Sequence, residues 1–337
     1  MAHHFTSPGA PLSVPAVSRR AVILAFLCAA PVVIVFATMF GSVELGAREW
    51  FAALRGDGAV IDQEILWGHR MPRVCAAFVT GGLLALAGVL LQTLLGNPLA
   101  DPYVLGVSGG VSVGGLLAML LGLGPFFIGA FGLLGACIVS AVLIAFAARS
   151  SGWDLYRVLL AGVGLASACG AFVALILTIS PAGQVQGMLF WLMGDLSASS
   201  DARQSAVILI LLTITCIALR AGLDALTLGA TKARLLGVSV GWTQSIAFLC
   251  ASIATVTAVL EAGAIGFVGI AVPHVFRLLG LHDHGALIPL SVLGGGILLA
   301  IADTIARTVA APIEIPVGVA TAAIGVPVLL WLIGRSR

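Results

Sequence analysis

The stretch VCAAFVTGGLLALAGVLLQTLL, residues 74–95, contains no charged side chain and is apolar over its whole length. About 20 consecutive apolar residues are needed for an α-helix to cross the hydrocarbon core of a bilayer. The stretch is therefore predicted to be a membrane-spanning helix, and it sets the class of the whole chain.

Nine further apolar stretches of similar character follow or precede it, so the sequence predicts an all-α integral membrane protein with about ten transmembrane helices. They lie at residues 21–40, 104–123, 125–148, 158–179, 205–219, 242–260, 262–281, 286–302 and 315–333. The stretch at 205–219 is short. The stretch at 262–281 contains Pro273, His274 and Arg277, so it is predicted to be broken or only partly embedded.

Composition agrees with this class. Of the 337 residues, 60% are hydrophobic and 9% are charged, and the mean hydropathy is +1.16. A water-soluble fold could not cover so much apolar surface. The formal net charge of +2 indicates no nucleic-acid partner. We expect residues 1–18 to be a disordered cytoplasmic N-terminus and residues 19–337 to form a single transmembrane domain.

The distribution of basic residues predicts how the chain is oriented. With the N-terminus in the cytoplasm, ten lysines and arginines fall on the cytoplasmic side and six on the other side. Cytoplasmic loops carry the excess of basic residues in membrane proteins. Both termini are therefore predicted to be cytoplasmic, in agreement with an even number of crossings.

Three polar connections interrupt the apolar pattern. The outer loop at 41–73 is amphipathic and ends in Arg70-Met71-Pro72-Arg73. The second connection, at 96–102, holds two prolines, an Asn and an Asp, which stop one helix and start another. The third, at 222–242, is predicted to form short helices at the cytoplasmic surface that contact another protein, although a solvated loop remains the alternative.

Catalytic and metal-binding motifs do not stand out. The sequence contains no GxxxxGK[ST] nucleotide-binding motif, so any ATPase must be a separate chain. His274, His282 and His284 are interpreted as structural or interfacial residues rather than metal ligands, and the six cysteines as small buried hydrophobes. An ion-coupled transporter with Glu261 or Asp303 as its carboxylate is one alternative function, and an intramembrane enzyme is another.

Several of these segments, taken in order, resemble the FecCD family of permeases. The matching segments are Arg70 to Arg73, residues 96–110, 159–162, 232–238 and 263–269, Pro273-His274 with Arg277, Asp303 with Arg307, and residues 316–318. The resemblance implies the permease subunit of a type II ATP-binding-cassette (ABC) importer in the bacterial inner membrane. It also implies a homodimer, two cytoplasmic ATPases that bind ATP and Mg, and a periplasmic substrate-binding protein. This chain would then hold no cofactor of its own.

The resemblance also assigns roles to residues by their position. It implies that Arg70, Arg73 and Arg307 dock the binding protein and that Asp154, Leu155 and Tyr156 form a cytoplasmic gate. The cargo it implies is an iron complex, haem or a ferric siderophore, carried from periplasm to cytoplasm, with vitamin B12 (cobalamin) as the alternative. The residues implied to couple the permease to the ATPase are Leu226, Gly229, Lys232, Arg234, Leu235, Leu236, Gly237 and Val238.

Overall fold

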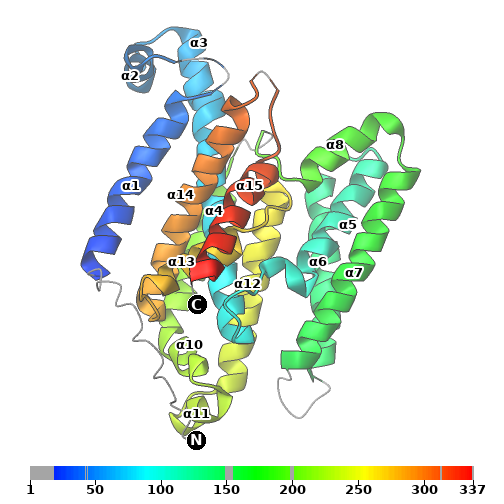
Figure 1. The fold of residues 1–337 in the computed structure, drawn as a ribbon. Helices are drawn as coiled ribbons and strands as arrows, with labels where there is room; N and C mark the ends of the chain where they lie inside the picture. The colour runs from blue at the N-terminus through cyan, green and yellow to red at the C-terminus, as the bar shows by residue number, and fades with distance from the viewer. Residues whose placement is uncertain are drawn as a thin grey trace, which may run out of the picture.

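The computed structural model describes residues 19–41, 43, 45–148, 155–197, 201–311 and 313–335, and every regular element in these ranges is a helix (Figure 1). The predicted disorder of residues 1–18 lies outside the described residues. The helices are α1 (Arg19–Met39), α2 (Ala47–Arg55), α3 (Val60–Gln63), η1 (Glu64–Arg70), α4 (Met71–Leu95), η2 (Pro102–Leu105), α5 (Val107–Leu120), α6 (Pro125–Ala148), α7 (Leu155–Ile179), α8 (Ala182–Leu192), α9 (Arg203–Ala218), α10 (Arg220–Thr227), α11 (Ala230–Leu235), α12 (Val240–Ala262), α13 (Val268–Leu278), α14 (His284–Thr308) and α15 (Val317–Arg335).

Each of the ten predicted stretches contains a helix, but the helices differ in length. Within the described residues, 6 are long and apolar enough to cross a membrane, or 7 if α9 and α10, which meet at an angle of 62°, are one bent span. The predicted spans at 104–123, 262–281 and 315–333 correspond to the shorter apolar helices α5 and α13 and to the apolar first part of α15. An all-helical multi-pass membrane protein is confirmed, whereas ten crossings and the orientation of the termini stay predictions.

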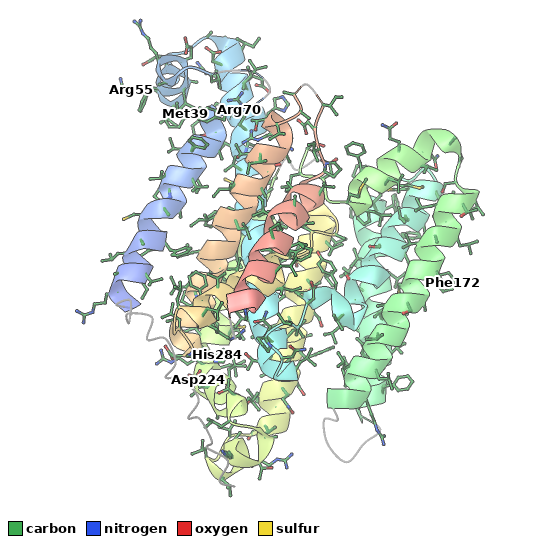
Figure 2. The ribbon with its side chains drawn as sticks, viewed as in Figure 1. Met39, Arg55, Arg70, Phe172, Asp224 and His284 are labelled. Carbon is green, nitrogen blue, oxygen red and sulfur yellow. The ribbon has the colours of Figure 1, made fainter. Side chains whose placement is uncertain are left out.

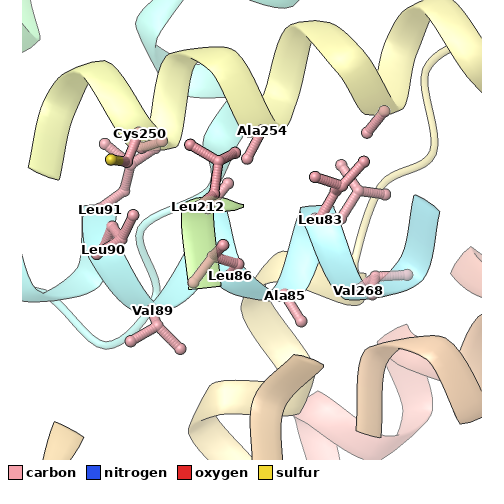
Figure 3. Close-up of a cluster of buried hydrophobic side chains, with 14 of the residues drawn as sticks. Leu83, Ala85, Leu86, Val89, Leu90, Leu91, Leu212, Cys250, Ala254 and Val268 are labelled. Carbon is pink, nitrogen blue, oxygen red and sulfur yellow. The ribbon is translucent and has the colours of Figure 1, made fainter. Parts of the chain in front are cut away.

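Helix α4 is the centre of the hydrophobic core. Its leucines, including Leu83, Leu86 and Leu90, are fully buried and meet Ala254 of α12 and Val268 of α13 (Figure 3). Helices α9, α12, α13 and α14 all pack against it. The stretch that predicted the fold class is therefore surrounded by protein.

Glycine allows α4 to approach its neighbours at backbone distance. A Cβ atom built on Gly81 would overlap the carbonyl of Gly295 on α14, and one built on Gly295 would overlap the carbonyl of Gly81. Small residues let membrane helices come close enough for van der Waals packing where no hydrophobic driving force exists. The glycines at 294–296 thus serve helix packing.

The span containing Pro273 is broken, as predicted. Residues 263–267 are not helical, and Phe267 has a positive φ of 71° before α13 begins. Pro273 has no N–H to donate to the carbonyl of Gly269, four residues earlier. The side-chain amide of Gln92 on α4 donates to that carbonyl instead, at 3.2 Å. A side chain from the core helix therefore replaces the hydrogen bond that the proline removes.

Tyr103 of η2 holds the non-helical segment in place. Its hydroxyl donates to the carbonyl of Ile265 at 3.1 Å and accepts from the N–H of the same residue at 2.8 Å. Burial raises the pKa of the Tyr103 hydroxyl, so it stays protonated and keeps its donor role. The predicted reversal at 96–102 is also present, with Gly96 ending α4 and the Asp101 carboxylate accepting from the N–H of Tyr103 at 2.7 Å.

Helices α5 to α8 form a second group beside the core (Figure 1). Helix α5 packs on α6 and α7, and this group meets the core mainly where α5 and α6 contact α12 and where η2 contacts α7. Helix α7 leaves large apolar side chains such as Leu160 and Phe172 exposed. Helix α8 lies in a connection for which the sequence predicts no helix.

Candidate functional site

A change in helical geometry positions the first two predicted arginines. Residues Glu64–Arg70 form a π-helix that runs directly into α4, with Pro72 close to the junction. Pro72 cannot donate a hydrogen bond to the preceding turn, and π segments are common at functional sites. The π-helix ends at Arg70, so Arg70 and Arg73 lie at the N-terminal end of α4. This is the end that also carries α2 and α3 (Figure 1).

Arg70 and Arg307 close the C-terminal end of α1. Arg70 donates to the carbonyls of Thr38, at 3.0 Å, and Met39, at 2.6 Å, and also to that of Val43. Figure 2 shows Arg70 beside Met39 at the end of α1. Arg307, on α14, donates to the carbonyl of Ala37. The last carbonyls of a helix have no partner within the helix and carry partial negative charge, so two guanidinium groups stabilise this end.

Arg73 is bonded to two carboxylates. Its guanidinium lies 2.9 Å from the Asp303 carboxylate and 2.9 Å from that of Glu314. Asp303 is fully buried and is also 3.4 Å from Arg307, whereas the Glu314 side chain is 41% exposed. Two arginines therefore surround Asp303 and balance its charge within the protein.

These side chains surround a small cavity of about 200 Å³ at this end of the helices. Three guanidinium groups against two carboxylates leave it with a net positive charge. The structure thus brings Arg70, Arg73 and Arg307 together, but the Arg70 and Arg307 side chains are buried and bonded within the chain. The cavity is lined by Gly41, Val43, Ile65, His69, Arg70, Arg73, Arg307 and Glu314.

The predicted coupling residues lie at the opposite end, on and after the short helices α10 and α11 (Figure 1). Leu235 is 83% exposed and Leu236 is 65% exposed, while Leu226 is buried in the main core. Gly229 and Gly237, on either side of α11, both have positive φ, which glycine adopts without strain. The predicted short helices are present. Gly229, Lys232, Arg234 and Gly237 are also exposed, and Val238 is half-buried.

A hydrogen-bonded group that the sequence analysis did not predict connects this segment to the core. The ring of His284, at the start of α14, lies 2.6 Å from the Asp224 carboxylate through Nδ1 and 2.8 Å from the Thr93 hydroxyl through Nε2. Figure 2 shows His284 and Asp224 side by side. The three residues are far apart in sequence, so no local spacing could have indicated the contact.

The predicted gate falls largely outside what the structure describes. Asp154 is not among the described residues, and Leu155 and Tyr156 are described only as the first residues of α7. Glu261, the other candidate carboxylate, accepts a hydrogen bond of 2.5 Å from the Ser205 hydroxyl between α9 and α12.

The helical core, the exposed apolar helices and the polar clusters at the two ends define a multi-pass membrane protein of the transporter class. Residues 28–335 match the FecCD transport family, and the chain belongs to that family. The resemblance to FecCD-type permeases of ABC importers is therefore confirmed over nearly the whole chain.

Two relatives illustrate the similarity in sequence. The chain is 37% identical to the vitamin B12 import system permease protein BtuC of Citrobacter koseri over 311 residues, which cover 90% of this chain and 91% of the relative. It is also 37% identical to the protein of the same name from Salmonella newport, over 86% of this chain and 89% of the relative.

Two solved structures illustrate the similarity in fold. An inward-facing metal-chelate type ABC transporter superposes with a TM-score of 0.81 and 27% identity, over 94% of this chain and 100% of that chain. PsaBC from Streptococcus pneumoniae, solved in complex with a Fab, superposes with a TM-score of 0.56 and 15% identity, over 85% of this chain and 95% of that chain. The second likeness concerns the fold alone.

Proposed function

We propose that this chain is the permease subunit of an ABC importer that carries vitamin B12 or a closely related corrinoid across the bacterial inner membrane. The observation that carries the proposal is the 37% identity to a vitamin B12 import permease over 90% of the chain. The resemblance to the family by itself implied an iron complex, haem or a ferric siderophore. The relatives favour the alternative, while the metal-chelate transporter at 27% identity keeps an iron chelate as the second candidate.

The exposed surfaces support the proposed partners. On α7, the apolar side chains of Leu160, Phe172 and Ile179 are all more than half exposed, which suits a second copy of this chain across a shared path. At the end that carries α10 and α11, exposed Leu235 and Leu236 suit a groove on an ATPase that binds ATP and Mg. Under this proposal α10 and α11 lie on the cytoplasmic side, in agreement with the predicted orientation.

Docking of a periplasmic binding protein is proposed at the arginine cavity. The pair between Arg73 and Glu314 is its most accessible part, since the Glu314 side chain is 41% exposed. A carboxylate of the binding protein would replace Glu314 at Arg73 without uncovering a buried charge. Arg70 and Arg307, which hold the end of α1, would then supply positive potential rather than direct contacts.

Transport by this scheme needs no covalent chemistry in the permease. ATP binding changes the permease only if the ATPases bind the coupling segment differently in the inward-open and outward-open states. The gate proposed at Asp154, Leu155 and Tyr156 would open and close at the cytoplasmic end of the path.

The test is ATP-dependent uptake by the reconstituted importer. The permease is purified with its ATPase, placed in vesicles with a binding protein, and supplied in turn with labelled cobalamin, haem and a ferric siderophore. We expect ATP-dependent uptake of cobalamin and little uptake of the other two. Uptake of an iron complex alone would show that the cargo is that complex and not cobalamin. Uptake driven by an ion gradient without ATP would overturn the proposal of an ABC importer.

A further inference from the structure

The group formed by Asp224, His284 and Thr93 is the most complete polar connection between the coupling segment and the helical core. Asp224 is on α10, His284 begins α14, and Thr93 is near the end of α4. The His284 side chain is 1% exposed. One buried ring therefore joins three helices that are distant in sequence.

The distances define the hydrogen bonds of this group. The contact of 2.6 Å between Nδ1 of His284 and the Asp224 carboxylate needs a proton between its two atoms, so Nδ1 donates to the carboxylate. Burial favours the neutral ring, whose Nε2 accepts from the Thr93 hydroxyl, 2.8 Å away. That hydroxyl also lies 2.8 Å from the carbonyl of Val89. The ring therefore bonds Asp224 through one nitrogen and Thr93 through the other.

Asp224 also holds the backbone of α14. The same carboxylate oxygen accepts from the N–H of His284 at 2.9 Å, so it satisfies one of the unpaired donors at the start of that helix. A shift of α10 would therefore move both the ring and the first turn of α14. On α4, Gln92 is adjacent to Thr93 and bonds to the carbonyl of Gly269 and to Arg277, both on α13.

We propose that Asp224, His284 and Thr93 transmit movement of the coupling segment to the helices of the core, and are positioning residues for transport. This inference rests on the proposed function, because it takes α10 and α11 to be the segment that the ATPase moves. Displacement of the segment without this connection would leave α4 and α14 in place. ATP would then be hydrolysed without transport.

The experiment measures cobalamin uptake and ATP hydrolysis in the same vesicles, with assembly of the complex checked by size-exclusion chromatography. We expect Asp224→Ala and His284→Gln to lower the uptake per ATP about tenfold, which corresponds to about 1.4 kcal/mol. ATP hydrolysis and assembly should be retained. Asp224→Asn keeps an oxygen that accepts both N–H bonds and should restore part of the ratio.

Two neighbours supply matched controls. His282 is an exposed histidine two residues before His284, and Asp283 accepts a bond of 3.2 Å from the N–H of Gly285 at the same helix end. His282→Gln and Asp283→Asn should therefore leave the uptake per ATP unchanged. Equal losses in these controls would overturn the proposal, since the effect would then belong to any polar change at this end.

Two outcomes would overturn the inference while leaving the proposed function intact. One is a wild-type importer that takes up cobalamin with ATP, together with unchanged uptake per ATP in both Asp224→Ala and His284→Gln. The other is a parallel loss of assembly, hydrolysis and uptake in Asp224→Ala, which would make the connection merely structural. A wild-type complex with no ATP-dependent uptake of any cargo would instead overturn the proposed function.

Discussion

Helices α4 and α7 have the same length, 25 residues each, and similar apolar character, yet they have different surroundings. In the most apolar part of the span that contains α4, 89% of the residues are buried within the chain, against 17% for α7. One helix is covered by protein on all sides, and the other presents most of its surface to lipid or to a partner.

The comparison teaches that hydropathy measures the need for an apolar environment and does not identify what supplies it. Glycine gives more information, since Gly81 touches the backbone of Gly295, whereas a Cβ atom on Gly170 of α7 would meet no atom of the described structure within 4 Å. Polar neighbours differ as well, because the N-terminal end of α4 carries Arg70 and Arg73, which bond to α1 and α14.

The largest effect should come from filling the contact between α4 and α14. Gly81→Val places side-chain atoms where the carbonyl of Gly295 lies, so we expect a loss of about 3 kcal/mol and little folded protein. Gly170→Val, the matched change on α7, should leave the stability of the isolated permease nearly unchanged. Thermal unfolding in detergent measures both. Equal stability of the two variants would contradict the contrast between the helices.

Removal of Arg70 should have the next largest effect. Arg70→Ala leaves the carbonyls of Thr38 and Met39 without their donor, at a cost of about 2 kcal/mol, because buried acceptors that lose a partner are expensive. Arg203→Ala, at a side chain that is 91% exposed, is the control and should cost little. The free energy of unfolding in denaturant distinguishes them, and a stable Arg70→Ala protein would show that α1 needs no such cap.

A smaller effect is expected for Glu314→Gln. Its pair with Arg73 is partly exposed, so the stability should change by less than about 1 kcal/mol. Loss of the carboxylate makes the arginine cavity more positive, and binding of an acidic docking surface should become tighter. Calorimetric titration with the binding protein checks this. Weaker binding would mean that Glu314 contacts the partner directly.

The smallest effect on the isolated chain is expected for Phe172→Ala on α7. The side chain is 56% exposed, so we expect a change in stability within about 0.5 kcal/mol. If a second copy covers this face, the same change should reduce chemical cross-linking between permeases in the membrane. Unchanged cross-linking would favour lipid as the surroundings of α7 at this position.

Much of the fold could be predicted because long runs of apolar residues in a sequence indicate membrane helices directly. Residues 125–148 were predicted as a span and form α6 over the same range. Helix α8 was not predicted, because it contains Gln184 and Gln186 in a connection that follows Pro181. The shortness of α13 could be anticipated from Pro273. The other shorter apolar helices, α5 and the first part of α15, could not be distinguished from full spans by composition.

The sites were predicted less completely than the fold. The resemblance marked Arg70, Arg73 and Arg307, and the structure brings them together. The hydrogen bonds of Arg70 and Arg307 to the carbonyls at the end of α1 could not be predicted. Every residue has a backbone carbonyl, so the sequence does not indicate which carbonyls accept these bonds. The contact between Asp224 and His284 spans 60 positions, and only the folded chain reveals it.

The contact between Arg307 and Ala37 has a consequence for how the protein is made. The two residues are 270 positions apart, so a ribosome that adds about 5 to 20 residues per second needs roughly 15 to 50 s to reach Arg307 after Ala37. During that interval the first helix is already synthesised, but one of its terminal carbonyls has no guanidinium partner. Arg70 can already hold the end of α1 in that interval, but the contact with α14 is still absent, so a nascent chain stalled before α14 would hold α1 at fewer points.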